Sequence, residues 1–249
     1  DAHIHAAANA DLWVWVHDLP DAQRVIQGIK GCAKSLNVVV KVDTGMGRFG
    51  VAPAEVEELL QFLQKSPSVQ VVSVATHFAT ADLDDALFAL QRDDFAQGKR
   101  LATQVMGRTA LRFQSANSAA LLRGAQMPGD IVRPGLAVYG YWPAPALYPV
   151  AEAQQVSLRP VLAWKTRLLQ IKRLAAGANV GYGGQTRLEK STLVATIPVG
   201  YAHGLNRRLS QRGTVLVGGK QVALLVNICM KVAMIDVSTV DNLRVGDEI

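Results

Sequence analysis

The most informative stretch of the chain reads Lys41-Val42-Asp43-Thr44-Gly45-Met46-Gly47-Arg48-Phe49-Gly50-Val51. A run of β-branched residues, Val38-Val39-Val40, leads into it, and such a run before a glycine-rich turn is typical of a buried strand that ends in a loop. Burying Lys41 is costly without a partner, so we expect the charges of Lys41, Asp43 and Arg48 to neutralise one another. The pattern fits either a structural ion-pair loop or a functional site at the end of a strand.

Predicted strands and helices alternate on both sides of this stretch. Apolar runs predict five strands, at residues 12–16, 38–42, 69–77, 111–115 and 131–139. Proline, N-cap residues and apolar spacing predict helices between them, from Asp18, from Pro53, over residues 84–106 and at 119–122. This alternation indicates an α/β fold with a parallel sheet of the barrel or doubly wound kind.

The alternation ends at the Pro-rich aromatic segment Tyr141-Trp142-Pro143-Ala144-Pro145. Short alternating runs follow, such as residues 162–167, and Gly218-Gly219 lies between two apolar runs as in a hairpin turn. We therefore predict two domains: residues 1–152 carry the parallel sheet, and residues 153–249 form a mainly β domain.

Composition narrows the class of protein. The 249 residues are 49% apolar and 18% charged, as in an ordinary globular chain, and the net charge is +6. Because the basic residues are spread out and not interleaved with aromatics, we expect a small anion rather than nucleic acid as partner. The sequence has no membrane-spanning apolar run and no leader, and its two cysteines lie far apart, so we expect a cytoplasmic protein.

Candidate site residues lie at or near the ends of the predicted strands. His77 ends the third strand, Asn117 and Ser118 follow the fourth, and the fifth contains Arg133, Gly135 and Leu136. A hydroxyl at a helix start and backbone N–H groups of a neighbouring strand suit a phosphate, although Ser118 would serve equally well as an N-cap. Arg133 lies in an apolar strand and needs an acceptor, which is either a carboxylate or the ring nitrogen of a cofactor.

Three residues of the second domain stand out. Tyr182 and Tyr201 each lie among glycines, where the backbone can approach another surface closely. Met230 follows Ile228-Cys229 and by itself is typical of a methionine that fills space in the hydrophobic core. Taken alone, each tyrosine fits a plain turn with a packed ring.

Lys41 to Arg48 closely resembles the K-V-D-T-G-M-G-R motif of alanine racemases, and further separated motifs follow in the family's order. The resemblance implies a pyridoxal-phosphate enzyme that interconverts L-alanine and D-alanine for peptidoglycan precursors. It implies the last five strands of a TIM (β/α) barrel, followed by the β-rich C-terminal domain. It also implies a homodimer whose active site lies at the subunit interface.

The resemblance implies roles residue by residue. Lys41 is the candidate for carbamylation, Arg48 contacts the cofactor and the substrate carboxylate, and His77 hydrogen-bonds Arg133, which faces the pyridine nitrogen. The residues that bind the cofactor phosphate are Ser118, Gly135 and Leu136, with Asn117 beside them. Tyr182 is one of two opposed catalytic bases, while Tyr201 and Met230 contact the substrate.

The chain departs from the family at several positions. The Schiff-base lysine has no counterpart, since the first lysine is Lys30, in a predicted helix, and the chain starts at Asp1 without methionine. We therefore expect a fragment that is inactive alone. His203 replaces an aspartate of the Gly-Tyr-Ala-Asp-Gly pattern, and Val226-Asn227 and Lys231 also differ from the usual residues.

Three alternatives follow from these departures and from one further motif. A broad-specificity amino-acid racemase fits the altered residues, and a non-catalytic module that binds pyridoxal phosphate fits the missing lysine. A metal-dependent amidohydrolase would use His3 and His5 of Asp1-Ala2-His3-Ile4-His5, with a carbamylated Lys41 as a bridge. On the first two readings no metal is needed.

Overall fold

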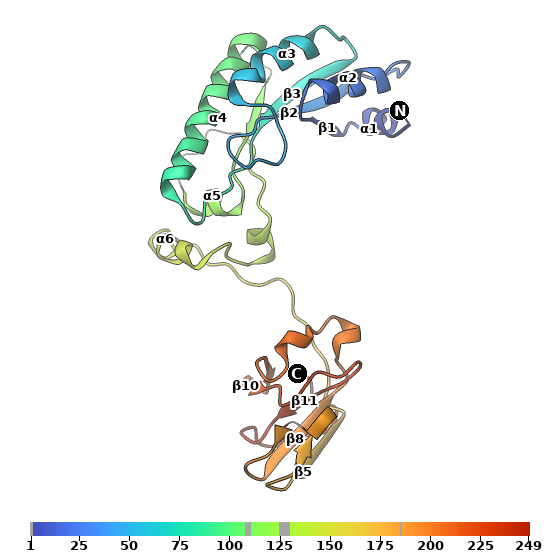
Figure 1. The fold of residues 1–249 in the computed structure, drawn as a ribbon, viewed down its shortest axis with the longest axis vertical. Helices are drawn as coiled ribbons and strands as arrows, with labels where there is room; N and C mark the ends of the chain where they lie inside the picture. The colour runs from blue at the N-terminus through green and yellow to red at the C-terminus, as the bar shows by residue number, and fades with distance from the viewer. Residues whose placement is uncertain (1, 108–110, 125–129, 185) are drawn as a thin grey trace. The chain divides into compact units, whose positions relative to one another are not determined.

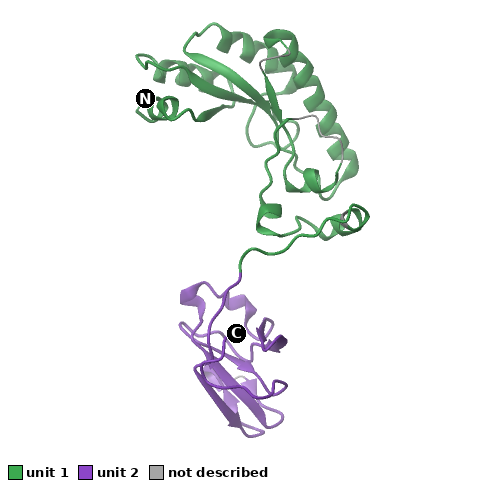
Figure 2. Cartoon of the chain, turned by 180° about the vertical axis from the view of Figure 1, so that it is seen from behind, with its two compact units in different colours: residues 1–162 green, residues 163–249 purple. Residues whose placement is uncertain are grey.

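The structure is a computed structural model, and it describes residues 2–107, 111–124, 130–184 and 186–249. The chain divides into two compact units, residues 1–162 and residues 163–249 (Figure 2). The boundary expected near residue 152 falls within α6 (Tyr148–Ala153) of unit 1. The division comes later because residues after 152 still bond to unit 1: Gln154 Nε2 donates to Arg123 O at 3.0 Å, and the N–H of Val161 donates to Tyr139 O at 3.2 Å.

Unit 1 contains a four-stranded parallel sheet in sequential order, β1 (Trp13–Val16), β2 (Leu36–Lys41), β3 (Val69–Ala75) and β4 (Arg112–Gln114). Helices connect the strands, as the blue-to-green part of Figure 1 shows. They are α1 (Ala2–Asn9), α2 (Leu19–Gly28), η1 (Pro53–Glu55), α3 (Val56–Gln64), α4 (Asp85–Met106) and α5 (Ser118–Leu122). The predicted alternation of strands and helices is thus confirmed through the fourth strand.

Local sequence explains where these helices start. Asp18 caps α2, because its carboxylate accepts the N–H of Asp21 at 2.7 Å. Asp84 caps α4 in the same way, accepting from Leu87 at 3.0 Å. The apolar face of α3 then packs into the core of unit 1, where Leu60 is fully buried with the β2 valines.

The strand predicted over residues 131–139 is wrong. Only Ile131 pairs with β4, through a single parallel bridge to Gln114, and residues Leu136–Tyr139 form the 3₁₀ helix η2. Pro134 cannot donate a hydrogen bond to a ladder, and Gly135 adopts φ −109° and ψ −86°, outside strand geometry. The remainder of unit 1 is η3 (Pro145–Leu147) and α6.

Unit 2 is mainly β, as predicted. β5 (Gln170–Leu174), β8 (Thr192–Ile197) and β11 (Ala233–Asp236) form an antiparallel sheet in the order β11-β8-β5. β9 (Thr214–Val217) and β10 (Lys220–Ala223) form the predicted hairpin, in which Gly218 and Gly219 both have positive φ. Short elements complete the unit: β6 (Asn179–Val180), η4 (Tyr182–Gly184), β7 (Thr186–Arg187), η5 (Tyr201–His203) and η6 (Arg207–Leu209).

The alternating run at residues 162–167 does not form a strand. Pairing is confined to its end, where Thr166 and Ile249 exchange two backbone hydrogen bonds of 2.9 Å and Arg167 forms one antiparallel bridge to Glu248. Leu162 and Trp164 are exposed. An alternating pattern becomes a strand only where a neighbour offers backbone partners in register. None of the helices in the described residues is both long and apolar enough to cross a membrane.

Candidate functional site

The candidate site of unit 1 lies where β2, β3 and β4 end. Parallel strands bring their carboxyl ends to one edge of the sheet, and Lys41 is the last residue of β2. Arg133 joins this edge, because its backbone N–H donates to Ala116 O, just after β4, at 2.8 Å. Its guanidinium reaches across to β3, where Nη2 donates to Thr76 O at 2.6 Å. Arg133 and His77 are therefore brought together.

Lys41 is a buried amine, 7% exposed, whose Nζ has no hydrogen-bond partner among the described residues. Burial, and then the nearby charges of Arg133 and Arg48, lower the pKa of Lys41 to about 7, although Asp43 opposes the shift. A large share of Lys41 is thus a neutral, nucleophilic amine near neutral pH.

Asp43 forms no direct ion pair with Lys41 or Arg48 among the described residues, although its charge acts on Lys41, so the alternative of a structural ion-pair loop is wrong. Its Oδ1 accepts the backbone N–H groups of Gly45, Met46 and Gly47 at 2.9, 2.9 and 3.1 Å. Within the described ranges, neither cation forms an ion pair with it. The carboxylate is used to fold the loop, because three backbone donors converge on it more closely than the side-chain cations do.

His77 is half-buried at the same edge. Burial, and then the charges of Lys41, Arg133 and Arg48, lower the pKa of His77 below its usual range. The expected hydrogen bond between His77 and Arg133 is not formed in the described part of the chain. Arg133 instead uses its two Nη groups on Thr76 O and on Gln114 Oε1, the latter at 3.2 Å.

Arg133 has no carboxylate partner among the residues that the structure describes. Burial lowers the pKa of Arg133 from its ordinary value, yet a guanidinium stays protonated in proteins. Besides the two amide oxygens it contacts a π face, since its Cζ lies 5.4 Å from the centroid of the Trp15 ring. The positive charge is thus solvated by dipoles and left without a counter-ion.

Ser118, Gly135 and the following residues converge on one point. Ser118 Oγ accepts the N–H of Gly135 at 2.8 Å and that of Ala137 at 3.2 Å, and the serine is 6% exposed. Asn117, rather than Ser118, is the N-cap of α5: its side chain accepts from Ala120 N and donates to Phe78 O, both at 3.0 Å. A hydroxyl and two backbone N–H groups are therefore gathered next to Arg133.

The candidate residues of unit 2 lie on turns. Tyr182 is 77% exposed in η4 and follows Gly181, where an added Cβ would lie 3.0 Å from Val226 Cβ. Tyr201 is exposed in η5, with the guanidinium of Arg207 5.9 Å from its ring centroid. Met230 is exposed, and its backbone oxygen accepts the N–H of Ala202 at 2.9 Å. Tyr201 and Met230 thus belong to one hydrogen-bonded unit.

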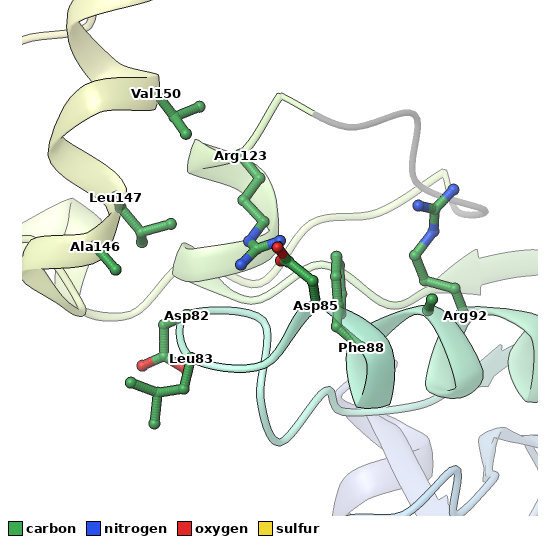
Figure 3. Close-up of a pocket in the computed structure, with 10 residues that line it drawn as sticks. Asp82, Leu83, Asp85, Phe88, Arg92, Arg123, Ala146, Leu147 and Val150 are labelled. Atoms are coloured by element: carbon green, nitrogen blue, oxygen red, sulfur yellow. The ribbon is translucent and has the colours of Figure 1, made fainter.

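A separate hollow of about 530 Å³ lies in unit 1 between the start of α4, α5 and the η3–α6 segment (Figure 3). The Asp85 carboxylate points toward the Arg123 guanidinium and forms an ion pair with it, and the Phe88 ring lies beside them. This hollow contains none of the candidate residues at the strand ends.

Sequence reasoning missed three contributors to the site. Thr76 and Gln114 orient Arg133, and Ala137 adds a second N–H beside Ser118. A glutamine in an apolar strand was the one available signal, because a buried amide needs a partner.

The metal-site alternative lacks geometric support. His3 and His5 lie in α1, where His5 Nε2 is 3.2 Å from Lys30 O, and the described residues contain no group of three potential metal ligands.

The fold and the site define the class of protein. It has an α/β unit with a cationic site suited to phosphate at its strand ends, and then a β unit with exposed tyrosines on glycine-containing turns. Comparison with known proteins narrows the class. The N-terminal domain family of alanine racemase matches residues 1–143, and its C-terminal domain family matches residues 161–249. The chain belongs to the alanine racemase family.

Individual relatives agree with this assignment. An alanine racemase of Desulfosudis oleivorans is 41% identical over 248 residues, which cover 93% of this chain and 60% of that protein. The crystal structure of alanine racemase from E. faecalis matches with a TM-score of 0.87 at 31% identity, over 99% of this chain and 64% of that one. The enzyme from Streptomyces lavendulae gives 0.86 at 33% identity, over 98% and 64%. The chain thus spans about three fifths of the length of the relatives that it matches.

The residues present fit the pyridoxal phosphate that the family implies. A phosphate needs N–H and O–H donors, and the Ser118 hydroxyl, whose oxygen accepts the N–H groups of Gly135 and Ala137, has no acceptor for its own hydrogen among the described residues. A ring nitrogen needs a donor that keeps its proton, and Arg133 is a half-buried cation with no carboxylate partner among the described residues.

Proposed function

We propose that the chain carries the cofactor-binding and substrate-binding residues of a pyridoxal-phosphate-dependent alanine racemase. The observation that carries this proposal is that Arg133, a half-buried cation with no carboxylate partner among the described residues, lies two residues before Gly135, whose N–H donates to the Ser118 hydroxyl. When bound, the cofactor withdraws electrons from the amino-acid Cα, so that its proton can leave and return.

The residues of unit 1 would bind and orient this cofactor. Ser118 Oγ and the N–H groups of Gly135 and Leu136 would hold the phosphate, with Asn117 fixing the start of α5. Arg133 would donate to the ring nitrogen and leave it unprotonated, which weakens electron withdrawal and favours return of the proton to Cα over side reactions. Arg48, exposed on the 43–51 loop, would bind the cofactor's phenolic oxygen and the substrate carboxylate.

Lys41 would be carbamylated in the working protein. Its neutral amine would attack the carbon of CO₂, form a C–N bond and release a proton, which leaves a carbamate anion. The support for this step is a buried amine with a pKa lowered to about 7 and no partner for its Nζ among the described residues. The new negative charge would offset the excess of cations at the strand ends and would hold Arg48.

The residues of unit 2 would complete the site from a second subunit. Tyr182 is exposed on a glycine turn, as a side chain that reaches a partner would be, and would hold or move one of the two protons. Tyr201 and Met230 would contact the substrate. The biological role would be the supply of D-alanine for peptidoglycan in the cytoplasm. A racemase with a broader substrate range remains the alternative.

The 249 residues alone would bind the cofactor without turning over alanine. Lysines before residue 163 are at positions 30, 34, 41, 65 and 99, and of these only Lys41 lies at the strand ends. Because Lys41 is assigned to the carbamate, no lysine of unit 1 is left for covalent attachment of the cofactor. We therefore expect no measurable racemisation by this chain.

Binding of pyridoxamine 5'-phosphate tests the proposal by titration calorimetry. Loss of charge-assisted bonds worth about 1.5–3 kcal/mol should weaken binding roughly 10- to 100-fold in Arg133→Ala. Pyridoxamine, which lacks the phosphate, should bind more weakly still. Arg112→Ala is the matched control, because Arg112 is exposed at the opposite end of β4. Equal binding of the two amines, or equal losses in the two variants, would refute the proposed site.

A further inference from the structure

The turn that carries Tyr201 is joined tightly to the segment that carries Met230. The N–H of Tyr201 donates to Cys229 O at 3.1 Å, and that of Ala202 donates to Met230 O at 2.9 Å. The two segments approach so closely that a Cβ on Gly200 would lie 2.3 Å from Cys229 O. Any change in this turn therefore moves both candidate substrate contacts.

His203 closes the turn through its side chain. The N–H of Gly200, which is a buried residue, donates to His203 Nδ1 at 3.1 Å, and the N–H of His203 returns to Gly200 O at 3.0 Å. A backbone N–H can only donate, so Nδ1 must be the unprotonated ring nitrogen. Protonation of the imidazole turns Nδ1 into a donor, which removes this bond and leaves the buried N–H of Gly200 without an acceptor.

The charged residues on the two segments next to this turn are cationic. Arg207 of η6 lies over the Tyr201 ring, and Arg208 follows it on the same element. The segment paired with the turn contributes Cys229 and Lys231, on either side of Met230. Within the described ranges no carboxylate forms an ion pair with His203. No carboxylate is thus placed to hold the imidazole in its protonated form.

We propose that His203 is a positioning residue: as a neutral imidazole it fixes the Tyr201 turn against the Met230 segment, and it releases the turn when it is protonated. An ionised carboxylate at this position would accept the same N–H, as the third residue of a capping box does. With an imidazole, the order of the substrate-side turn depends on the protonation state of the ring. The consequence for the substrate rests on the proposed function, but the release of the turn does not.

Amide hydrogen exchange of the full 249-residue chain, followed by NMR, tests the release without any ligand. The protection factor of the Gly200 amide, corrected for the intrinsic exchange rate at each pH, should fall about tenfold from pH 7.5 to pH 5.5. In His203→Asp it should be high at both pH values, and in His203→Ala low at both. The imidazole ¹⁵N spectrum should show a bare Nδ1 at pH 7.5. An unchanged wild-type protection factor, or the same fall in His203→Asp, would overturn the proposal.

Phosphopyridoxyl-L-alanine, a stable covalent adduct of cofactor and substrate, tests the consequence. Its dissociation constant is measured for wild type and for His203→Asp at each pH. Dividing the wild-type value by that of the variant cancels the titration of the ligand itself. This ratio should rise several-fold between pH 7.5 and pH 5.5 if the turn contacts the substrate. Failure of the adduct to bind any variant, with pH-dependent Gly200 exchange intact, would refute the proposed function and leave the role of His203 standing. Tight binding with a constant ratio would refute the substrate-side role of the turn.

Discussion

Lys41, which is buried, and Arg133, which is half-buried, are two cations at one sheet edge that are accommodated in different ways. Arg133 keeps its charge because two amide oxygens and the Trp15 ring solvate it. Lys41 has no such partners among the described residues, and its pKa falls to about 7 instead. A guanidinium can spread its charge over several acceptors, whereas a buried ammonium without them gives up its proton.

The stability of the chain should therefore depend on pH through Lys41. Its pKa of about 7 in the folded state lies below the unfolded value near 10.4, so the unfolded state binds more protons between these values. Stability then rises with pH across this window. In CO₂-free buffer, Lys41→Met should be more stable than wild type at pH 7. That advantage, measured by urea unfolding, should shrink by about 2 kcal/mol by pH 9.

Lys65→Met is the control for this comparison, because Lys65 is exposed and its variant should track wild type at every pH. A constant difference between Lys41→Met and wild type would show that Lys41 stays charged in the folded protein. In ¹³C-bicarbonate, the wild type should give a carbamate carbon signal that Lys41→Met lacks.

The buried charge of Arg133 was foreseeable from the sequence, but its partners were not. An arginine in an apolar segment must find an acceptor wherever it lies. The acceptors come from Gln114 and Thr76, 19 and 57 residues away in the chain, and only the register of the parallel strands brings them together. The role of Asp43 was misjudged for the converse reason: its partners are its immediate backbone neighbours.

At the scale of elements, the loop from Asp43 to Gly50 has positive φ at Gly45, Gly47 and Gly50, and the last two of these need glycine for different reasons. Gly47 has φ +66° with open space where a Cβ would lie, and Gly50 has φ +117° with no such space. A Cβ on Gly50 would lie 2.8 Å from Asp43 N and 2.9 Å from Lys41 O. Gly50 thus lets the loop return to the end of β2, where Asp43 N donates to Val51 O at 2.8 Å.

These two glycines form a matched pair for mutation. Gly47→Ala should cost about 1 kcal/mol of unfolding free energy, from its left-handed backbone alone. Gly50→Ala should cost at least about 3 kcal/mol, because backbone strain and overlap with main-chain atoms add. Gly50→Ala should also weaken pyridoxamine 5'-phosphate binding, since it shifts the loop that bears Arg48. Equal costs in urea unfolding would show that the close approach at Gly50 is unimportant.

Elements with strong local signals were predicted well. The capped helix α4 and the valine-rich β2 were expected within a residue or two of their observed ends. The prediction of a strand over residues 131–139 was wrong because it gave more weight to apolar content than to Pro134-Gly135. These two residues interrupt the hydrogen-bond ladder between strands. The run at residues 162–167 failed because a strand needs a neighbour, which a local pattern cannot reveal.

At the scale of the whole molecule, each unit has its own core and its own share of the candidate residues. Leu60 and Phe95 are fully buried in unit 1, and Ile197 and Ile235 in unit 2. The cationic cluster belongs to unit 1, and Tyr182, Tyr201 and Met230 belong to unit 2. Under the proposed function, a complete site takes unit 1 from one subunit and unit 2 from its partner.

Mixing two defective chains tests this arrangement. Arg133→Ala disables unit 1, and Tyr201→Ala disables unit 2, so each variant alone should bind phosphopyridoxyl-L-alanine weakly. An equal mixture should regain tight binding at about a quarter of the sites, because half of random dimers are mixed and each mixed dimer has one intact pair of units. The quantity measured is the number of tight sites by calorimetry. No recovery, with the mixed species confirmed by sedimentation, would show that each site is made within one chain.

The Asp43 carboxylate accepts three backbone amides through Oδ1, and this has a practical consequence for work with this protein. Because this carboxylate is not paired with the cations, Arg133 and Arg48 at the strand ends can attract a small oxyanion from the solution. Purification in phosphate or sulfate would fill this place with buffer, and affinities would then vary with the choice of salt as much as with the protein.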